Sequence, residues 1–213
     1  MEANFWLERW QRNEIGFHEA EVHPLLRNYW PTIIAAHAKH SGNVFVPLCG
    51  KSLDMIWLIE QGLHVYGVEL SAVGVEAFFN ENNIPFEKSA AGKLEKYASE
   101  NATIFAGDIF SLSNDMLPAL DLFYDRAALV ALPSVMRADY VAKVASLLVP
   151  GAHGLLVSLE YEDGLINPPP HSISFETVSA TYGSHCQCDL LGSGAGAVKG
   201  KPCIEHAVHL RLK

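Results

Sequence analysis

The hydrophobic pattern of the chain alternates between short apolar runs and longer amphipathic stretches. Short apolar runs bounded by turn residues predict strands, and their low polar content is typical of a parallel sheet that is covered on both faces. Five such runs lie near 44–46, 64–68, 103–106, 120–124 and 154–159. Two more strands are expected near 185–190 and 204–210, where no long helix separates the apolar runs. We expect this last pair to be antiparallel.

The amphipathic stretches between these runs predict helices on both faces of the sheet. Ser52 and Ser71 stand where a side-chain oxygen can cap a helix, and Ser134 can open a third one after Pro133. The three helices are expected over 52–61, 71–80 and 134–148. The Gly-rich segment 192–201 is expected to be a mobile connection between the last two strands.

The part of the chain ahead of the first strand is apolar-rich and helical in pattern. Helices are expected near 2–13 and 21–40, with Pro24 and Pro31 as interruptions, because proline lacks the amide hydrogen that a helix interior needs. These helices precede the sheet and are expected to cover it.

Length and composition suit one globular domain, because 213 residues with 49% hydrophobic content can bury a sizeable core. We predict a single α/β domain over 1–213. A helical N-terminal cover over 1–40 precedes the sheet core over 41–213. The sheet is expected to be seven-stranded and mostly parallel, flanked by helices, with its last strand antiparallel.

The charge balance and the cysteines bear on partners and location. A formal net charge of −9 argues against a nucleic-acid partner, which needs a basic face. The first residues lack the charged-then-apolar pattern of a secretory signal, and no apolar run approaches the ~18–20 residues of a membrane helix. The four cysteines form no CxxC pair. We expect a cytoplasmic monomer that binds neither nucleic acid nor membrane.

Cys186 and Cys188 lie two positions apart and would share one face of a strand, whereas His185 would face the other way. A metal site would need further ligands. We therefore interpret both cysteines as core residues and expect no metal.

The stretch "NVFVPLCGKSLDMIWLIEQG", residues 43–62, predicts a buried strand, a tight turn at Gly50 and a helix. A P-loop requires another Gly five positions before Gly50, but Phe45 stands there inside the strand, so this motif fails on spacing. A dinucleotide fingerprint requires three glycines, and the turn has one. An adenosine ligand without phosphates is the interpretation that remains.

Polar residues follow the next three strands. Glu69 ends the second strand, where a carboxylate accepts hydrogen bonds from a ribose diol; the alternative is an ordinary acid near a helix start. Asp108 and Ile109 follow the third strand and could hold an adenine, or could form a turn and a core contact. Asp125 and Arg126 follow the fourth strand and could belong to a site or form a local ion pair.

The motifs "WLERW…GFH", "PLCGKSLDMIWL…G…V.GVE", "DIF" and "YDRAALVALP" occur along the chain in this order. With these motifs the sequence resembles the thiopurine S-methyltransferase family over nearly its whole length. The resemblance implies the Rossmann-like fold of class I methyltransferases. It also implies S-adenosyl-L-methionine as methyl donor, with S-adenosyl-L-homocysteine as product.

The resemblance assigns residues of the N-terminal half to the donor. Trp6 and Trp10 are four apart on one helix face and would close over the donor; the alternative is that both are core residues. Phe17 would line both the donor and the acceptor pockets. Leu48 would contact the amino-acid end of the donor through its backbone.

The resemblance likewise assigns Glu69 to the ribose and Asp108 with Ile109 to the adenine. Arg126 would bind the donor and lie beside the methyl group and the acceptor sulfur. Because an arginine cannot act as a base at neutral pH, we expect Arg126 to favour the thiolate or an anionic ring edge. The expected acceptors are small aromatic or heterocyclic thiols such as thiopurines.

Alternatives stay open at this point. The same chemistry could methylate selenium or tellurium compounds as a detoxification, and the fold could serve as a non-catalytic adenosyl-ligand binding module. An NAD-dependent oxidoreductase is disfavoured by the missing glycines. Where the family carries a turn like "GPPF", this sequence has Pro-Pro-Pro-His at 168–171, and the segment 192–201 also differs. Both departures leave the acceptor open.

Overall fold

The structure, a computed structural model, describes residues 3–16, 18–37 and 40–213. These residues form two compact units. The first unit consists of Ser41–Leu120 and the described part of 1–23, and the second consists of Asp121–Lys213 and the described part of 24–40. The segment 1–40, which the sequence pattern groups as one cover, is therefore divided between the two units.

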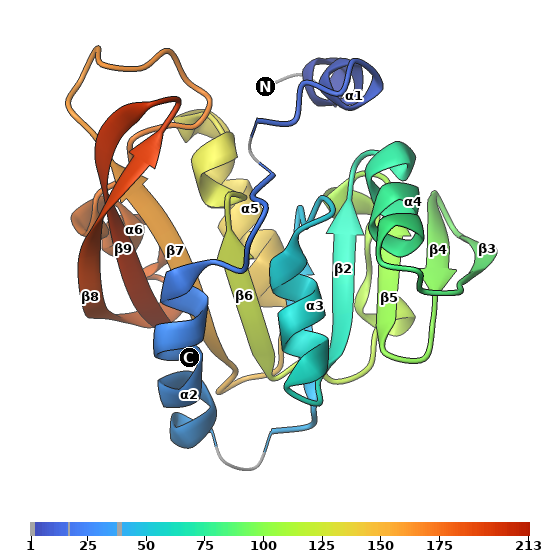
Figure 1. The fold of residues 1–213 in the computed structure, drawn as a ribbon. Coiled ribbons are helices and arrows are strands. Elements are labelled where there is room, and N and C mark those ends of the chain that lie inside the picture. Colours follow the sequence, from blue (N-terminus) through green and yellow to red (C-terminus); the bar gives the residue numbers. More distant parts are fainter. Residues whose placement is uncertain (1–2, 17, 38–39) are drawn as a thin grey trace. The chain divides into compact units, whose positions relative to one another are not determined.

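The first unit is an α/β arrangement with the strand order β3-β4-β5-β2-β1 (Figure 1). Its strands are β1 (Asn43–Pro47), β2 (His64–Glu69), β3 (Glu87–Ala91), β4 (Leu94–Ala98) and β5 (Ala102–Ala106). β1, β2 and β5 are parallel, and β3 and β4 add antiparallel strands beyond β5. Its helices are α1 (Ala3–Gln11), α3 (Leu53–Glu60), α4 (Ala72–Glu81) and the short 3-10 turns η1 (Ile109–Ser111) and η2 (Asn114–Met116).

Local sequence explains the central elements of this unit. All five residues of β5 and four of the five in β1 are buried, as expected for parallel strands covered on both faces. The Ser52 side chain accepts a hydrogen bond from the Asp54 amide, and the Ser71 side chain accepts one from the Gly74 amide. Both predicted helix caps are confirmed.

The hairpin of β3 and β4 is not predicted by the hydrophobic pattern. Four of the five residues of β3 are exposed and the fifth is only partly buried, so no apolar run marks it. In β4 the buried residues are Leu94 and Tyr97. Gly92, with a φ of +62°, supplies the left-handed residue of the two-residue turn between them. The described residues thus contain nine strands, where the pattern predicts seven.

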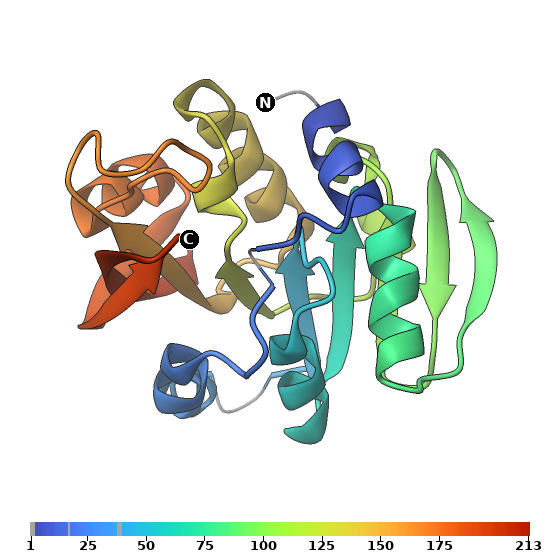
Figure 2. The same ribbon diagram turned by 45° about the horizontal axis from the view of Figure 1, so that its top comes forward.

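The second unit has the strand order β6-β7-β9-β8. Its strands are β6 (Leu122–Arg126), β7 (His153–Glu160), β8 (Cys186–Val198) and β9 (Lys201–Leu212). β6 and β7 are parallel, whereas β9 is antiparallel to both β7 and β8, which confirms the predicted antiparallel pair. Its helices are α2 (Pro24–Ala36), α5 (Ser134–Leu147), α6 (Phe175–Tyr182) and the 3-10 turn η3 (Leu129–Ala131). Figure 2 shows α2 and α5 on opposite faces of β6 and β7.

Two expectations about the second unit are wrong. The first is that Pro24 and Pro31 interrupt a helix. α2 begins at Pro24, where proline needs no helical partner for its nitrogen, and it continues through Pro31. Pro31 is exposed while Leu26 and Trp30 are buried, so packing of the apolar face maintains the helix across the proline.

The Gly-rich stretch is the second wrong expectation, because residues 192–198 are strand and not a mobile connection. They pair with β9 as far as Val198, and only Lys199 and Gly200 form the turn. A Cβ atom on Gly192 would lie 2.0 Å from the Tyr29 hydroxyl oxygen. At that position glycine gives room to a neighbouring side chain and does not serve flexibility.

Candidate active site

The turn after β1 has a strained backbone. Leu48 has a φ of +46° and Gly50 a φ of +53°, and left-handed backbone is uncommon for a residue such as leucine. The Cys49 amide donates to the Val68 carbonyl at 3.0 Å, which fixes the turn to the end of β2. Strained backbone of this kind concentrates at ligand sites. It lies where the sequence predicts contact with the amino-acid end of a donor.

Glu69, the last residue of β2, is 6% exposed and has several hydrogen-bond donors around it. Its Oε2 accepts from the Gly50 amide and its Oε1 from the Ser71 amide, both at 2.9 Å. Burial raises the pKa of this carboxyl group, while hydrogen bonds from Ser71, Gly50 and the Trp10 side chain oppose that increase. Glu69 therefore connects the turn after β1, the turn after β2 and helix α1.

Trp10 holds α1 against the rest of the first unit. It is 6% exposed and lies on a surface made by two glycines. A Cβ on Gly74 would be 2.8 Å from the Trp10 ring, and one on Gly50 would be 3.4 Å from it. Trp6 is only partly buried and packs edge-on against Phe5, with ring centroids 5.3 Å apart. The sequence reasoning missed Gly74, whose place at the start of α4 gives no signal of this contact.

The turn after β5 lies next to Glu69. The Gly107 amide donates to the Glu69 carbonyl at 2.8 Å. Asp108 is exposed, and its Oδ1 accepts from the Phe110 amide at 3.0 Å, so this side chain caps η1. Ile109 is buried at 7% exposure. One oxygen of the Asp108 carboxylate therefore forms the turn, as the alternative interpretation expects.

The structure brings together the predicted donor residues of the first unit. Glu69 ends β2, and Leu48 and Asp108 come shortly after β1 and β5. These three strands are adjacent and parallel, so their carboxyl ends meet at one edge of the sheet. Open α/β sheets bind ligands at this edge. The predicted residue Phe17 lies outside the described residues. The contacts of these side chains with a donor stay predictions.

Arg126 belongs to the second unit, where it is the last residue of β6 and is partly buried. Ala127, which follows it, has a φ of +63°, a second strained position directly after a strand. The Pro-rich turn is held nearby, because the His171 amide donates to the Val130 carbonyl in η3 at 2.7 Å. The segment in which this sequence departs from the family thus lies beside the loop that follows Arg126.

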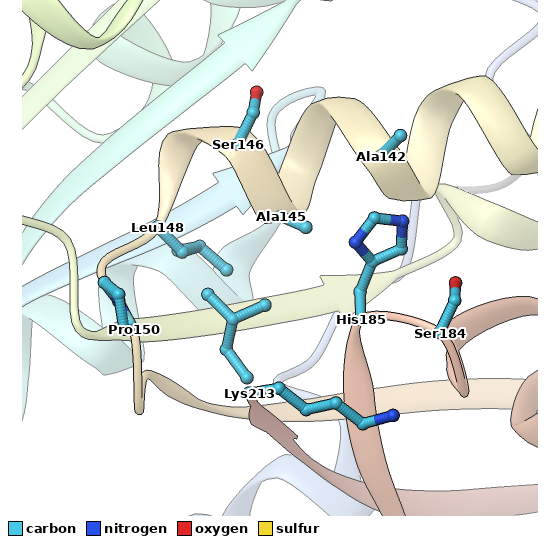
Figure 3. A pocket seen from close by; sticks show the side chains of 9 residues that line it. Ala142, Ala145, Ser146, Leu148, Pro150, Ser184, His185 and Lys213 are labelled. Atoms are coloured by element: carbon cyan, nitrogen blue, oxygen red, sulfur yellow. The ribbon is translucent and has the colours of Figure 1, made fainter.

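A cavity of about 530 Å³ in the second unit is not the predicted site. It lies between α5 and the end of β9, and Figure 3 shows the His185 ring beside Ala142 and Ala145 of α5, with Lys213 on the far side. The end of β9 pairs with the start of β7, so this cavity is at the amino end of the parallel strands. Ligands of open α/β sheets bind at the opposite edge.

Other predicted features concern metals and membranes. Among the described residues, no group of three or more His, Cys, Asp or Glu side chains is arranged to hold a metal ion. Cys186 is buried and Cys188 partly buried. In the part of the chain that the structure describes, no helix is long and apolar enough to cross a bilayer.

Comparison with known proteins agrees with the motifs. Residues 1–202 match the thiopurine S-methyltransferase family. The chain belongs to this family. A thiopurine S-methyltransferase from Shewanella sp. (strain MR-7) is 46% identical over 219 aligned positions, which cover 99% of this chain and 98% of that protein. One from Bordetella pertussis is 43% identical over 191 positions, covering 90% and 86%. The predicted family and enzyme class are confirmed.

Solved structures show the fold. A Burkholderia thailandensis 1,6-didemethyltoxoflavin-N1-methyltransferase, crystallised with S-adenosylhomocysteine, has a TM-score of 0.68 at 14% identity and covers 99% of this chain and 87% of its own. The Synechocystis magnesium protoporphyrin IX methyltransferase with bound SAM has a TM-score of 0.64 at 11% identity, covering 99% and 97%. The predicted class I methyltransferase fold is confirmed.

Proposed function

We propose that this thiopurine S-methyltransferase family member transfers the methyl group of S-adenosyl-L-methionine to the sulfur of small aromatic or heterocyclic thiols such as thiopurines. The observation that carries the proposal is the buried Glu69 carboxylate, placed beside the strained turn of Leu48 at the carboxyl end of the sheet. The named relatives support the thiol, and the solved methyltransferases crystallised with SAM or S-adenosylhomocysteine support the donor.

The residues of the first unit fit an adenosyl donor that has no phosphate. The Glu69 carboxylate accepts hydrogen bonds from the Gly50 and Ser71 amides, and the Trp10 side chain also donates to it. Ribose hydroxyls would bind this carboxylate beside the Trp10 indole. Gly50 lets the Trp10 ring lie against the turn, and Ile109 supplies apolar surface for a flat ring. Phosphates would require exposed amides at glycine spacings that this turn does not have.

The chemistry requires alignment of two sulfur atoms more than a strong base. The donor, when bound, supplies a methyl group on a sulfonium that is already activated. The acceptor reacts best as a thiolate, and aromatic thiols ionise more readily than a cysteine with its pKa of about 8.5. Arg126 stabilises that thiolate or an anionic edge of the acceptor ring. The protein thereby binds the acceptor in its reactive form and excludes water around it.

The test mixes the protein with methyl-labelled S-adenosyl-L-methionine and a panel of acceptors: 6-mercaptopurine, thiophenol, and phenol as the oxygen analogue. Label is expected in the two thiols and not in phenol. Arg126→Ala should lower kcat/KM for thiophenol more than for an alkyl thiol, which is mostly protonated at neutral pH. Arg211→Ala, an exposed arginine of the same unit, is the matched control. Binding of S-adenosylhomocysteine without label in any thiol would contradict the proposed acceptor.

A further inference from the structure

Asp125 precedes Arg126 at the end of β6, and its side chain is fully buried. Oδ2 accepts hydrogen bonds from the Tyr140 hydroxyl at 2.8 Å and from the Tyr182 hydroxyl at 2.9 Å. Oδ1 accepts one from the Leu129 amide at 3.3 Å. A buried carboxylate is costly unless such partners satisfy it. The two hydroxyls and the amide all donate to the Asp125 carboxylate, so together they fix the position of this side chain.

The donors to Asp125 come from three different elements. Tyr140 is on α5, Tyr182 ends α6, and Leu129 begins η3. Both tyrosines are 1% exposed, so their hydroxyls are held by packing as well as by the carboxylate. Asp125 and the two tyrosines, the Asp125 cluster, therefore join the end of β6 to both helices of one face.

The Asp125 cluster closes the strained loop that contains Arg126. Ala127 has a φ of +63°, a conformation that persists only where the surrounding structure fixes it. Asp125 lies before this residue, and the Leu129 amide that bonds to Asp125 lies after it. The hydrogen bond thus spans Arg126, Ala127 and the next residue. Loss of the cluster would let this loop relax.

The Asp125 cluster acts on Arg126 through the backbone of the loop and not through contact with the Arg126 side chain. Successive side chains of a strand point to opposite faces, so Arg126 shares its face with Tyr124 and not with Asp125. Tyr124 packs against Trp30 of α2, with ring centroids 6.3 Å apart. The Asp125 side chain instead bonds to tyrosines of α5 and α6, so it points to the face opposite Tyr124.

We propose that Asp125, Tyr140 and Tyr182 are positioning residues that fix the direction of the Arg126 side chain towards the acceptor thiolate. The proposal rests on the proposed function, in which Arg126 favours the ionised acceptor. A displacement of about 1 Å is enough to lower a rate on the order of 100-fold when a charge must meet a reacting atom. A loop strained at Ala127 holds such a position only if it is anchored, and the Asp125 cluster provides the anchor.

The test replaces one hydroxyl at a time, with Tyr140→Phe and Tyr182→Phe, which keep the aromatic packing. kcat and KM are measured for thiophenol and for an alkyl thiol, at a temperature where circular dichroism shows each variant folded. The kcat/KM for thiophenol should fall about 10- to 100-fold, and that for the alkyl thiol should fall much less. The Kd for S-adenosylhomocysteine, measured by calorimetry, should change by no more than it does in Arg126→Ala.

Tyr97→Phe is the matched control. Tyr97 is also fully buried, and its hydroxyl donates to the carboxylates of Glu76 and Glu95 in the first unit. This variant also loses a tyrosine hydroxyl that is bonded to a carboxylate. Its ratio of kcat/KM between the two thiols should equal that of the unsubstituted protein.

Repeating the tyrosine substitutions in an Arg126→Ala background identifies the route of the effect. If the Asp125 cluster acts through Arg126, Tyr182→Phe should change the thiol ratio no further in that background. Tyrosine variants that lower Tm but leave the ratio unchanged would overturn the proposal, and so would an effect that persists without Arg126. Failure of the unsubstituted protein to methylate any thiol would instead refute the proposed function, and this role of Arg126 with it.

Discussion

Glu69 and Asp125 are buried carboxylates at the carboxyl ends of two parallel strands, and they differ in where their partners come from. Glu69 accepts from amides of the turns that flank it, and the Trp10 indole adds a donor. Asp125 accepts from two tyrosine hydroxyls, 15 and 57 positions away along the chain. Burial raises the pKa of both groups, and hydrogen bonds oppose it in both.

The difference separates two uses of the same group. Backbone amides of two turns hold Glu69 at the carboxyl end of β2, the edge where open α/β sheets bind ligands, which is why we propose a binding role for this carboxylate. Asp125 is fully buried and bonds to a tyrosine from each of two helices and to the Leu129 amide, so this carboxylate suits fixing the loop that carries Arg126. Substitutions of both carboxylates and of a neighbour of Trp10 test the contrast, a pH dependence marks what lies outside it, and the largest expected effect is at Asp125.

Asp125→Ala should lower the free energy of unfolding by about 3–5 kcal/mol, because two buried hydroxyls and one amide lose their acceptor. Urea denaturation measures this loss. The triple variant with Tyr140→Phe and Tyr182→Phe should recover part of it, since removing both partners of a buried hydrogen bond costs less than removing one. A triple variant no more stable than Asp125→Ala would show that the hydroxyls do not depend on this carboxylate.

Glu69→Gln should weaken donor binding by about 1–3 kcal/mol, because the neutral amide is a poorer acceptor and turns an N–H group towards other donors. Calorimetry with S-adenosylhomocysteine measures the change. Glu81→Gln, which removes an exposed carboxylate that pairs with Lys51 in the same unit, is the control and should bind normally. Unchanged affinity in Glu69→Gln would remove this residue from the donor site.

Gly74→Ala should weaken donor binding by about 1–2 kcal/mol, because the new methyl group would lie 2.8 Å from the Trp10 ring and displace α1. The same calorimetric titration measures it, and limited proteolysis near residue 11 reports the position of α1. Gly194→Ala, where no atom lies within 4 Å of the new Cβ, is the control. If both variants bind alike, the contact of Trp10 with Gly74 has no part in donor binding.

The smallest expected effect is a pH dependence that neither carboxylate causes. Burial lowers the pKa of His153 to about 4, with further lowering from His209 and His37, whose ring stacks on that of His153. A histidine with a lowered pKa binds protons more readily in the unfolded chain, so stability should fall as pH decreases from about 6.5 to about 4. Glu69 and Asp125 have raised pKa values, so their protonation favours the folded state and opposes this loss.

Urea midpoints between pH 7 and pH 4 measure this dependence. His153→Asn should flatten the curve, since it removes the group with the most lowered value while an amide can replace the hydrogen bond that now joins His153 to His209 at 2.9 Å. An unaltered slope in His153→Asn would assign the acid sensitivity to other groups.

Several elements were predictable because their signals are local. The runs at 44–46, 64–68 and 103–106 each became a strand, since burial on both faces requires consecutive apolar residues. Ser52 and Ser71 cap their helices through amides two and three positions ahead. The hairpin of β3 and β4 and helix α6 (Phe175–Tyr182) were missed, because exposed strands and a helix of eight residues give weak patterns.

The sequence by itself determined the family, the parallel strands of each unit and the placement of Leu48, Glu69 and Asp108 at one sheet edge. These follow from motifs and periodicities that span a few residues. Only the tertiary structure decided which groups satisfy the buried carboxylates, that Gly74 makes room for Trp10, and that the glycines of 192–198 are strand. Such partners lie far apart in the chain, and a buried polar group selects them by proximity in the folded state, which no local pattern records.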